Sequence, residues 1–96
     1  MILKKFEKQP ADVKDYDIFY NEWLVPGDAL NNAVVVIEPS GNPSDLKVDS
    51  VFVASDKVKI WLSAGITNML YKATVTATTD DGRVVQHEFV MKVRDR

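Results

Sequence analysis

Alternation of apolar and polar residues is the clearest pattern in this chain, and it is strongest in the last third. Nearly every second residue is apolar across residues 71–79, and a second alternating run covers residues 85–93. Between them, Asp80-Asp81-Gly82 has the composition of a tight hairpin turn. Because successive side chains of a strand point to opposite faces, the pattern predicts a β-hairpin with one buried face.

Shorter runs predict further strands in the first two thirds of the chain. Tyr16, Ile18 and Tyr20 alternate with polar residues and predict a half-buried strand. Similar signals cover residues 30–37, 46–54 and 57–62. Within the first of these, residues 33–37 are a continuous, mostly β-branched run. Such a run indicates a strand that is shielded on both faces or well covered on one.

The segment 46–54 changes phase along its length. Leu46 and Val48 share one side-chain phase, whereas Val51 and Val53 share the opposite one. A β-bulge near residues 49–50 would bring both pairs to the same face, because one extra residue reverses the facing. Two short strands with a bend between them are the alternative.

These signals together predict the fold class and its extent. No segment has an apolar period of 3.6 residues over ten or more positions, so we expect little or no helix. The pattern favours an all-β, immunoglobulin-like β-sandwich of six to seven antiparallel strands, with a small barrel as the alternative. Residues 1–13 are charged and lack a sustained period, which predicts a flexible N-terminal arm, solvated or used for docking. Residues 14–96 are then a single β-sandwich domain.

Composition narrows the classes of partner and chemistry. The chain has 96 residues, a net charge of −2 and no cysteine. The charge predicts no nucleic-acid partner. The lack of cysteine excludes disulfides, thiolate zinc sites and cysteine nucleophiles, and it fits a reducing cytoplasm. With no signal-peptide core and no run of 18 apolar residues, we expect no membrane association.

The residues that could carry chemistry are few. His87 is the only histidine and has no recognisable nucleophile beside it, so we expect a satisfied, partly buried side chain. The acidic pairs Asp15/Asp17, Asp45/Asp49 and Asp80/Asp81 match no calcium loop and are expected to be structural. The sequence therefore predicts no enzyme, no cofactor, no metal site and no small-molecule substrate.

Three aromatic residues fall out of phase with their strands. Trp61 alternates against Ile60 and Leu62 and is expected to face outward, unless a loop or the N-terminal arm covers it. Phe19 and Phe52 are also out of phase with their apolar neighbours. Exposed aromatic residues are typical of partner surfaces. A carbohydrate- or ligand-binding module that uses them as stacking platforms is the alternative.

Short motifs follow one another in a defined order along the chain: Asp15-Tyr16-x-Ile18-x-Tyr20-x-x-Trp23-Leu24, Gly27-Asp28, Ile60-Trp61-Leu62-Ser63-x-Gly65, Tyr71-x-x-x-Val75, Gly82-Arg83 and Phe89-x-x-x-Val93-Arg94. Their order and spacing resemble a family of small tailed-phage and prophage virion proteins described as fiber-tail adaptors. The resemblance covers roughly residues 8–96. The loop at residues 38–46 is longer and richer in proline than the family pattern.

The resemblance implies a non-enzymatic virion protein that links tail or neck components to fibers. Its expected partners are other virion proteins, with self-association as a further expectation, and its expected location is the virion after synthesis in the host bacterial cytoplasm. For the interface we expect the outward aromatic residues and the C-terminal segment: Phe19, Phe52, Trp61, Arg94 and Arg96.

Overall fold

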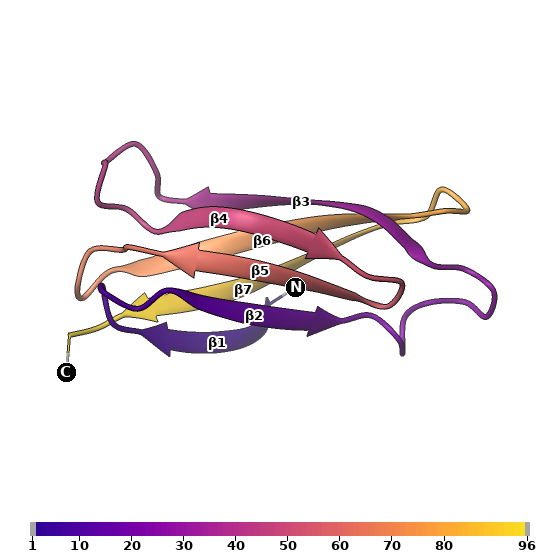
Figure 1. Ribbon diagram of the computed structural model, residues 1–96, viewed down its shortest axis with the longest axis horizontal. Helices are drawn as coiled ribbons and strands as arrows, with labels where there is room; N and C mark the ends of the chain where they lie inside the picture. Colours follow the sequence, from indigo (N-terminus) through magenta and orange to yellow (C-terminus); the bar gives the residue numbers. More distant parts are fainter. Residues whose placement is uncertain (1, 96) are drawn as a thin grey trace.

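The computed structural model describes the backbone of residues 2–95 and the side chains of residues 5–95. In this part of the chain seven strands form two stacked sheets, and no helix is present that could cross a membrane (Figure 1). The strands are β1 (Ile2–Lys8), β2 (Lys14–Phe19), β3 (Leu30–Glu38), β4 (Lys47–Val53), β5 (Lys57–Ser63), β6 (Leu70–Thr79) and β7 (Val84–Val93). The all-β prediction is confirmed, and the strand order is compatible with an immunoglobulin-like sandwich.

The two sheets contain four and three strands. The larger has the order β1-β7-β6-β3 and the smaller has the order β2-β5-β4, so the chain forms two open sheets rather than the alternative barrel. The predicted C-terminal hairpin is present as β6 and β7, with Val75 opposite His87. The predicted bulge in β4 is also confirmed, because the β4–β5 register shifts between Val48 and Ser50.

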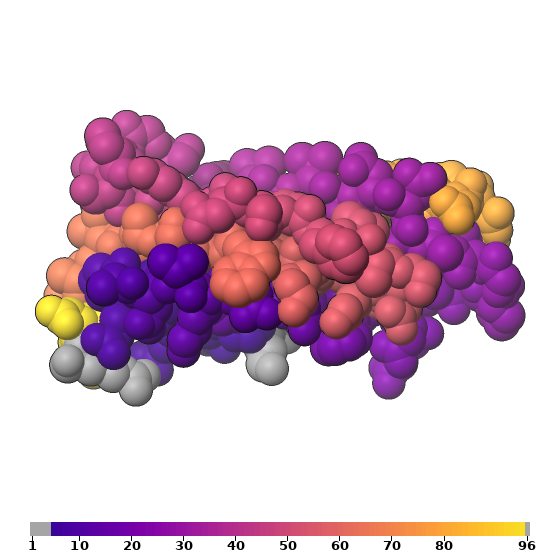
Figure 2. All heavy atoms as spheres, viewed as in Figure 1, coloured from indigo at the N-terminus to yellow at the C-terminus, as the bar shows by residue number. Residues whose placement is uncertain are grey.

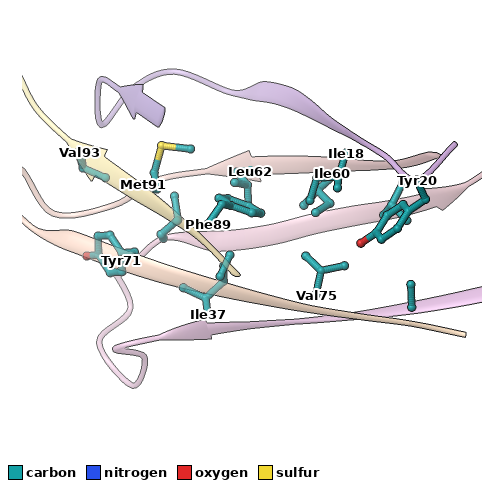
Figure 3. Packing of buried hydrophobic residues seen from close by; sticks show 14 of the residues in the cluster. Ile18, Tyr20, Ile37, Ile60, Leu62, Tyr71, Val75, Phe89, Met91 and Val93 are labelled. Atoms are coloured by element: carbon teal, nitrogen blue, oxygen red, sulfur yellow. The ribbon is translucent and has the colours of Figure 1, made fainter. Parts of the chain in front are cut away.

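The core lies between the sheets and is filled by the alternating residues that the sequence assigns to it. Figure 3 shows Ile60 and Leu62 of β5 packed among side chains of β6 and β7. Ten inward residues of these three strands are at most 1% exposed: Val58, Ile60, Leu62, Tyr71, Ala73, Val75, Ala77, Phe89, Met91 and Val93. Burial of each large apolar side chain stabilises the fold by about 1.5–3 kcal/mol.

Part of the segment predicted as an N-terminal arm is a strand. β1 pairs in parallel with β7, so the expected all-antiparallel arrangement does not hold for this pair. The ring of Phe6 anchors β1, with its centroid 4.8 Å from that of Tyr16 and 5.4 Å from that of Phe89. The apolar pattern is weak because an edge strand pairs through its backbone and buries one face only. The flexibility of this segment in solution stays a prediction.

β3 is also different from its expected environment. Its continuous apolar run predicts a strand that is shielded on both faces or well covered on one. In the structure β3 is an outer strand of the four-stranded sheet and pairs with β6, and at its first residue the N–H of Leu30 also donates to the carbonyl of Ser55. Val34 and Val36 face outward and are 54% and 52% exposed. The inward residues Ala33 and Val35 are only half-buried.

Candidate protein-binding face

The three aromatic residues predicted to face outward lie on one surface, the outer face of the β2-β5-β4 sheet. Phe19 of β2 is opposite Lys57, Phe52 of β4 is opposite Lys59, and Trp61 lies on β5 between these strands. Positions 57, 59 and 61 point to the same side of β5, because side chains alternate along a strand. The three aromatic residues thus occupy about 14 Å of one sheet face, at 3.4 Å per residue.

All three aromatic side chains are accessible. Phe19 is 64% exposed, Phe52 is 60% exposed and Trp61 is 38% exposed. The alternative in which a loop or the N-terminal segment covers Trp61 is therefore not observed. Figure 2 shows this face toward the viewer, with β4 and β5 across its middle. We call this surface the aromatic face, defined by Phe19, Phe52 and Trp61.

A network of ion pairs fills the space between the aromatic rings. The ammonium group of Lys59 donates to Asp15 Oδ2 over 2.9 Å and lies 3.8 Å from Asp17 Oδ1. Lys57 Nζ lies 3.8 Å from Asp17 Oδ2 and 5.8 Å from the ring centroid of Phe19. The hydrogen bond from Lys59 lowers the pKa of the Asp15 carboxyl, and the same contact raises the pKa of Lys59.

These pairs determine the character of the aromatic face more than its stability. Exposed ion pairs contribute little to stability, because solvent and salt screen their attraction. The charges of the two lysines and the two aspartates cancel, and the ion pairs hold these side chains in place. The aromatic rings therefore lie beside an ordered group of side chains that has no net charge. A neutral surface with large rigid side chains suits a protein partner, because aromatic residues dominate binding energy at interfaces.

Arg94 does not join the aromatic face. Arg94 follows β7 of the other sheet, where its Nη1 atom lies 3.6 Å from Glu7 Oε1 and its backbone N–H donates to the carbonyl of Lys8. Arg96 lies outside the described residues. Arg94 instead lines a groove of about 640 Å³, together with Lys5, Phe6, Glu7, Leu70, Val90 and Lys92. The terminal residues of this groove fall in segments for which the sequence offers docking as one alternative, whereas Leu70 and Val90 were not predicted. The sequence signal that could have indicated them is their position in the strand alternation, which places the apolar side chains of Leu70 and Val90 on the outward face.

The acidic residues have structural contacts, as expected. Asp45 accepts a hydrogen bond from the hydroxyl of Tyr71 over 2.8 Å, Asp49 from Ser63 over 2.9 Å, and Asp80 from Asn31 over 2.8 Å. Within residues 2–95, no group of three or more histidine or acidic side chains is placed to hold a metal ion.

The side chain of His87 differs from its expected state. It is only 8% exposed, and its Nδ1 atom has no hydrogen-bond partner among the described residues. It packs against Tyr20, with the ring centroids 5.3 Å apart. The prediction of a satisfied histidine is therefore wrong at Nδ1, which is buried beside the Tyr20 ring without a hydrogen bond. Burial lowers the pKa of the imidazole.

Comparison with known proteins supports the sequence resemblance. A comparison with curated proteins gives no significant match. A family model described as podophage GP4 fiber-tail adaptor protein gp77 matches residues 8–92, which include the aromatic face, β2 to β6 and nearly all of β7. Because this match spans most of the chain, the protein belongs to this family of phage fiber-tail adaptors.

Proposed function

We propose that the chain is a non-enzymatic structural adaptor that connects tail or neck components of the virion to fibers through protein–protein contacts. Membership of the fiber-tail adaptor family supports an adaptor role in the virion. The observation that supports binding through protein–protein contacts is the aromatic face, where Phe19, Phe52 and Trp61 are exposed on one sheet. Synthesis in the bacterial cytoplasm, before incorporation into the particle, belongs to the same proposal.

The aromatic face has the properties that a docking surface requires. Its side chains come from three hydrogen-bonded strands, so they are held in place before a partner arrives. Trp61 lies on the central strand and is flanked in register by Asp15 and Ser50. A central tryptophan with charged residues nearby is a common arrangement for an interface hot spot, where truncation costs about 2 kcal/mol or more.

Incorporation of variants into phage particles tests this proposal. Particles are assembled with the double variant Phe52→Ser/Trp61→Ser in place of the native chain, and adaptor and fiber copies are counted by quantitative mass spectrometry. We expect both counts to fall together, because the aromatic face is the contact that holds the adaptor to its partner. Full occupancy with this variant would contradict the proposal.

A matched control separates loss of binding from loss of folding. Leu70 and Val84 are 58% and 62% exposed on the opposite sheet, so Leu70→Ser/Val84→Ser removes similar apolar surface elsewhere. This control is expected to enter particles like the native chain. Equal loss with both double variants would also count against the aromatic face. Near-ultraviolet circular dichroism establishes that each variant is folded.

Exposure of Trp61 also favours a second candidate function, the binding of a carbohydrate. A carbohydrate-binding module would use Trp61 and Phe52 as stacking platforms, and the open position of both rings favours access by a sugar. A glycan array with the purified protein examines this function. Specific binding that Trp61→Ser abolishes would favour it, and an array without binders removes it.

A further inference from the structure

The outer edge of β3 lacks the features that protect the other sheet edges. β1 carries Lys5 and Lys8, and β2 carries Asp15 and Asp17. β4 carries charged residues and is interrupted by its bulge. Charges and bulges on an edge strand prevent it from pairing with another chain. β3 has no charged residue before Glu38, and its register with β6 is regular from Asn32 to Glu38.

The backbone along this edge is unpaired in the described chain. Within its sheet β3 pairs with β6 on one side only, and β4 of the other sheet lies near it without pairing. Between residues 31 and 38 of the described chain, the outer backbone groups make no hydrogen bond to a further element. The inward side chains of β3 are likewise incompletely covered. Ala33 and Val35 point into the core but stay half-buried, whereas their partners on β6, Ala77 and Val75, are fully buried.

The apolar run of β3 therefore has more apolar surface than a single copy of the chain buries. Residues 33–37 have the composition of a strand whose two faces are covered. An added strand would hydrogen-bond the free backbone and place its own side chains beside the exposed valines of β3.

We propose that β3 is a self-association edge, where two copies of this chain pair antiparallel about a two-fold axis at Val35. The four-stranded sheets of the two copies then form one continuous sheet. This surface is distinct from the aromatic face and does not depend on the proposed function.

The side chains of β3 select a second copy and its register. With Val35 opposite Val35, the exposed Val34 meets Val36 of the second copy, and Asn32 meets its Glu38. No like charges face each other, and the amide of Asn32 is a donor for the carboxylate. Moving the axis to Val36 would place Glu38 against Val34. A shift of the pairing by one residue would place outward side chains against inward ones.

Cysteine crosslinking tests the partner and the register together. The chain has no native cysteine, so single variants carry a single thiol. In the proposed register, positions 34 and 36 of opposite copies are about 4.5–5.5 Å apart in Cα distance, within disulfide reach. Identical positions 34 are about 8 Å apart, beyond that reach, because they are offset by two residues along the strands.

An equimolar mixture of Val34→Cys and Val36→Cys is oxidised, and dimers are measured by non-reducing electrophoresis and mass spectrometry. We expect a disulfide-linked dimer that contains one copy of each variant, and little disulfide-linked dimer when either variant is oxidised alone. The mixture of Val84→Cys and Val36→Cys is the control, because position 84 is exposed on β7 away from the edge.

Three outcomes would overturn the proposal. The first is the absence of crosslinks together with a monomer at every concentration in light scattering. The second is a Val34→Cys dimer as abundant as the mixed one. The third is a crosslink between Lys5→Cys and Val34→Cys, which would indicate head-to-tail pairing of β1 with β3. Val36 faces outward, so the variant Val36→Lys is expected to stay folded but to lose the self-association that the native chain shows.

Discussion

The hydroxyl of Tyr71 donates a hydrogen bond to Asp45 Oδ1 over 2.8 Å and accepts one from the backbone N–H of Ile66 over 3.0 Å. Tyr71 is fully buried on β6, and Asp45 is 6% exposed at the end of the loop that joins β3 to β4. Asp45 also caps this loop, because its Oδ2 atom accepts from the N–H of Asn42. One side-chain contact thus fastens the loop that crosses between the two sheets to β6, an inner strand of the four-stranded sheet.

Replacement of Tyr71 by phenylalanine is expected to destabilise the fold by about 1.5–3 kcal/mol, the range for hydrogen bonds to charged groups. The ring stays in the core, so the loss comes from the buried Asp45 carboxylate and the N–H of Ile66, each left without the hydroxyl. Urea unfolding measures this difference. Thr76→Val, which removes a hydroxyl bonded to Gln86 at an exposed site, is the control and should have little effect. An equal loss in both variants would argue against a special role for the Tyr71 contact.

The ammonium group of Lys8 fastens β1 to the rest of the domain. The Lys8 side chain is buried, and its Nζ donates to the carbonyl of Gln9 over 2.6 Å and to the carbonyl of Ala64. Lys8→Ala leaves these carbonyls without their donor, so we expect a loss of about 1–3 kcal/mol. Amide exchange along β1 should accelerate more than exchange in β6. Lys5→Ala, on the same strand at an exposed position, is the control. Unchanged exchange in β1 would mean that Phe6 alone anchors the strand.

Much of this fold follows from the period-two pattern. The β6–β7 hairpin and the bulge beside Val48 were predictable, because each depends on which residues of one strand face the core. The strand β1 was not predictable in the same way. It pairs in parallel through its backbone, and its buried residues include Lys8. Lysine side chains are usually exposed to solvent. The stem of a lysine can be buried when its ammonium group reaches backbone carbonyls.

The candidate site was predictable residue by residue but not as a surface. Phase along each strand shows that Phe19, Phe52 and Trp61 leave the core. Their meeting on one face depends on the order β2-β5-β4 and on the β4 bulge, which are tertiary features. The unpaired β3 edge was missed for a related reason. A continuous apolar run indicates neighbours, but it does not show whether they belong to the same chain.

Burial of His87 makes stability depend on pH. Desolvation lowers the pKa of the folded imidazole below its ordinary value of 6.5. The unfolded chain therefore binds a proton first as the pH falls through 6.5, and this lowers the free energy of unfolding. Between pH 7 and 5.5, we expect the urea midpoint of the native chain to decrease. His87→Phe keeps the ring packing against Tyr20 and should flatten this decrease. If the native chain and His87→Phe respond equally to pH, another group is responsible.

Gly65 is required by both its backbone conformation and its surroundings. Its φ is +108°, and a Cβ atom there would lie 2.6 Å from Cγ2 of Val93, a side chain that is fully buried. Gly65→Ala is therefore expected to lose more than the roughly 1–3 kcal/mol of a strained backbone position alone. Gly41 has a similar φ of +118° but no atom within 4 Å of the added Cβ, so Gly41→Ala measures the conformational strain by itself. Denaturant unfolding of both variants gives the difference, which is the cost of displacing Val93. Gly65→Ala should cost less in a Val93→Ala background than in the native chain, because the Cγ atoms that the added Cβ would meet are then absent. Equal losses in the two glycine variants would show that contact with Val93 contributes nothing and that only the positive φ restricts residue 65.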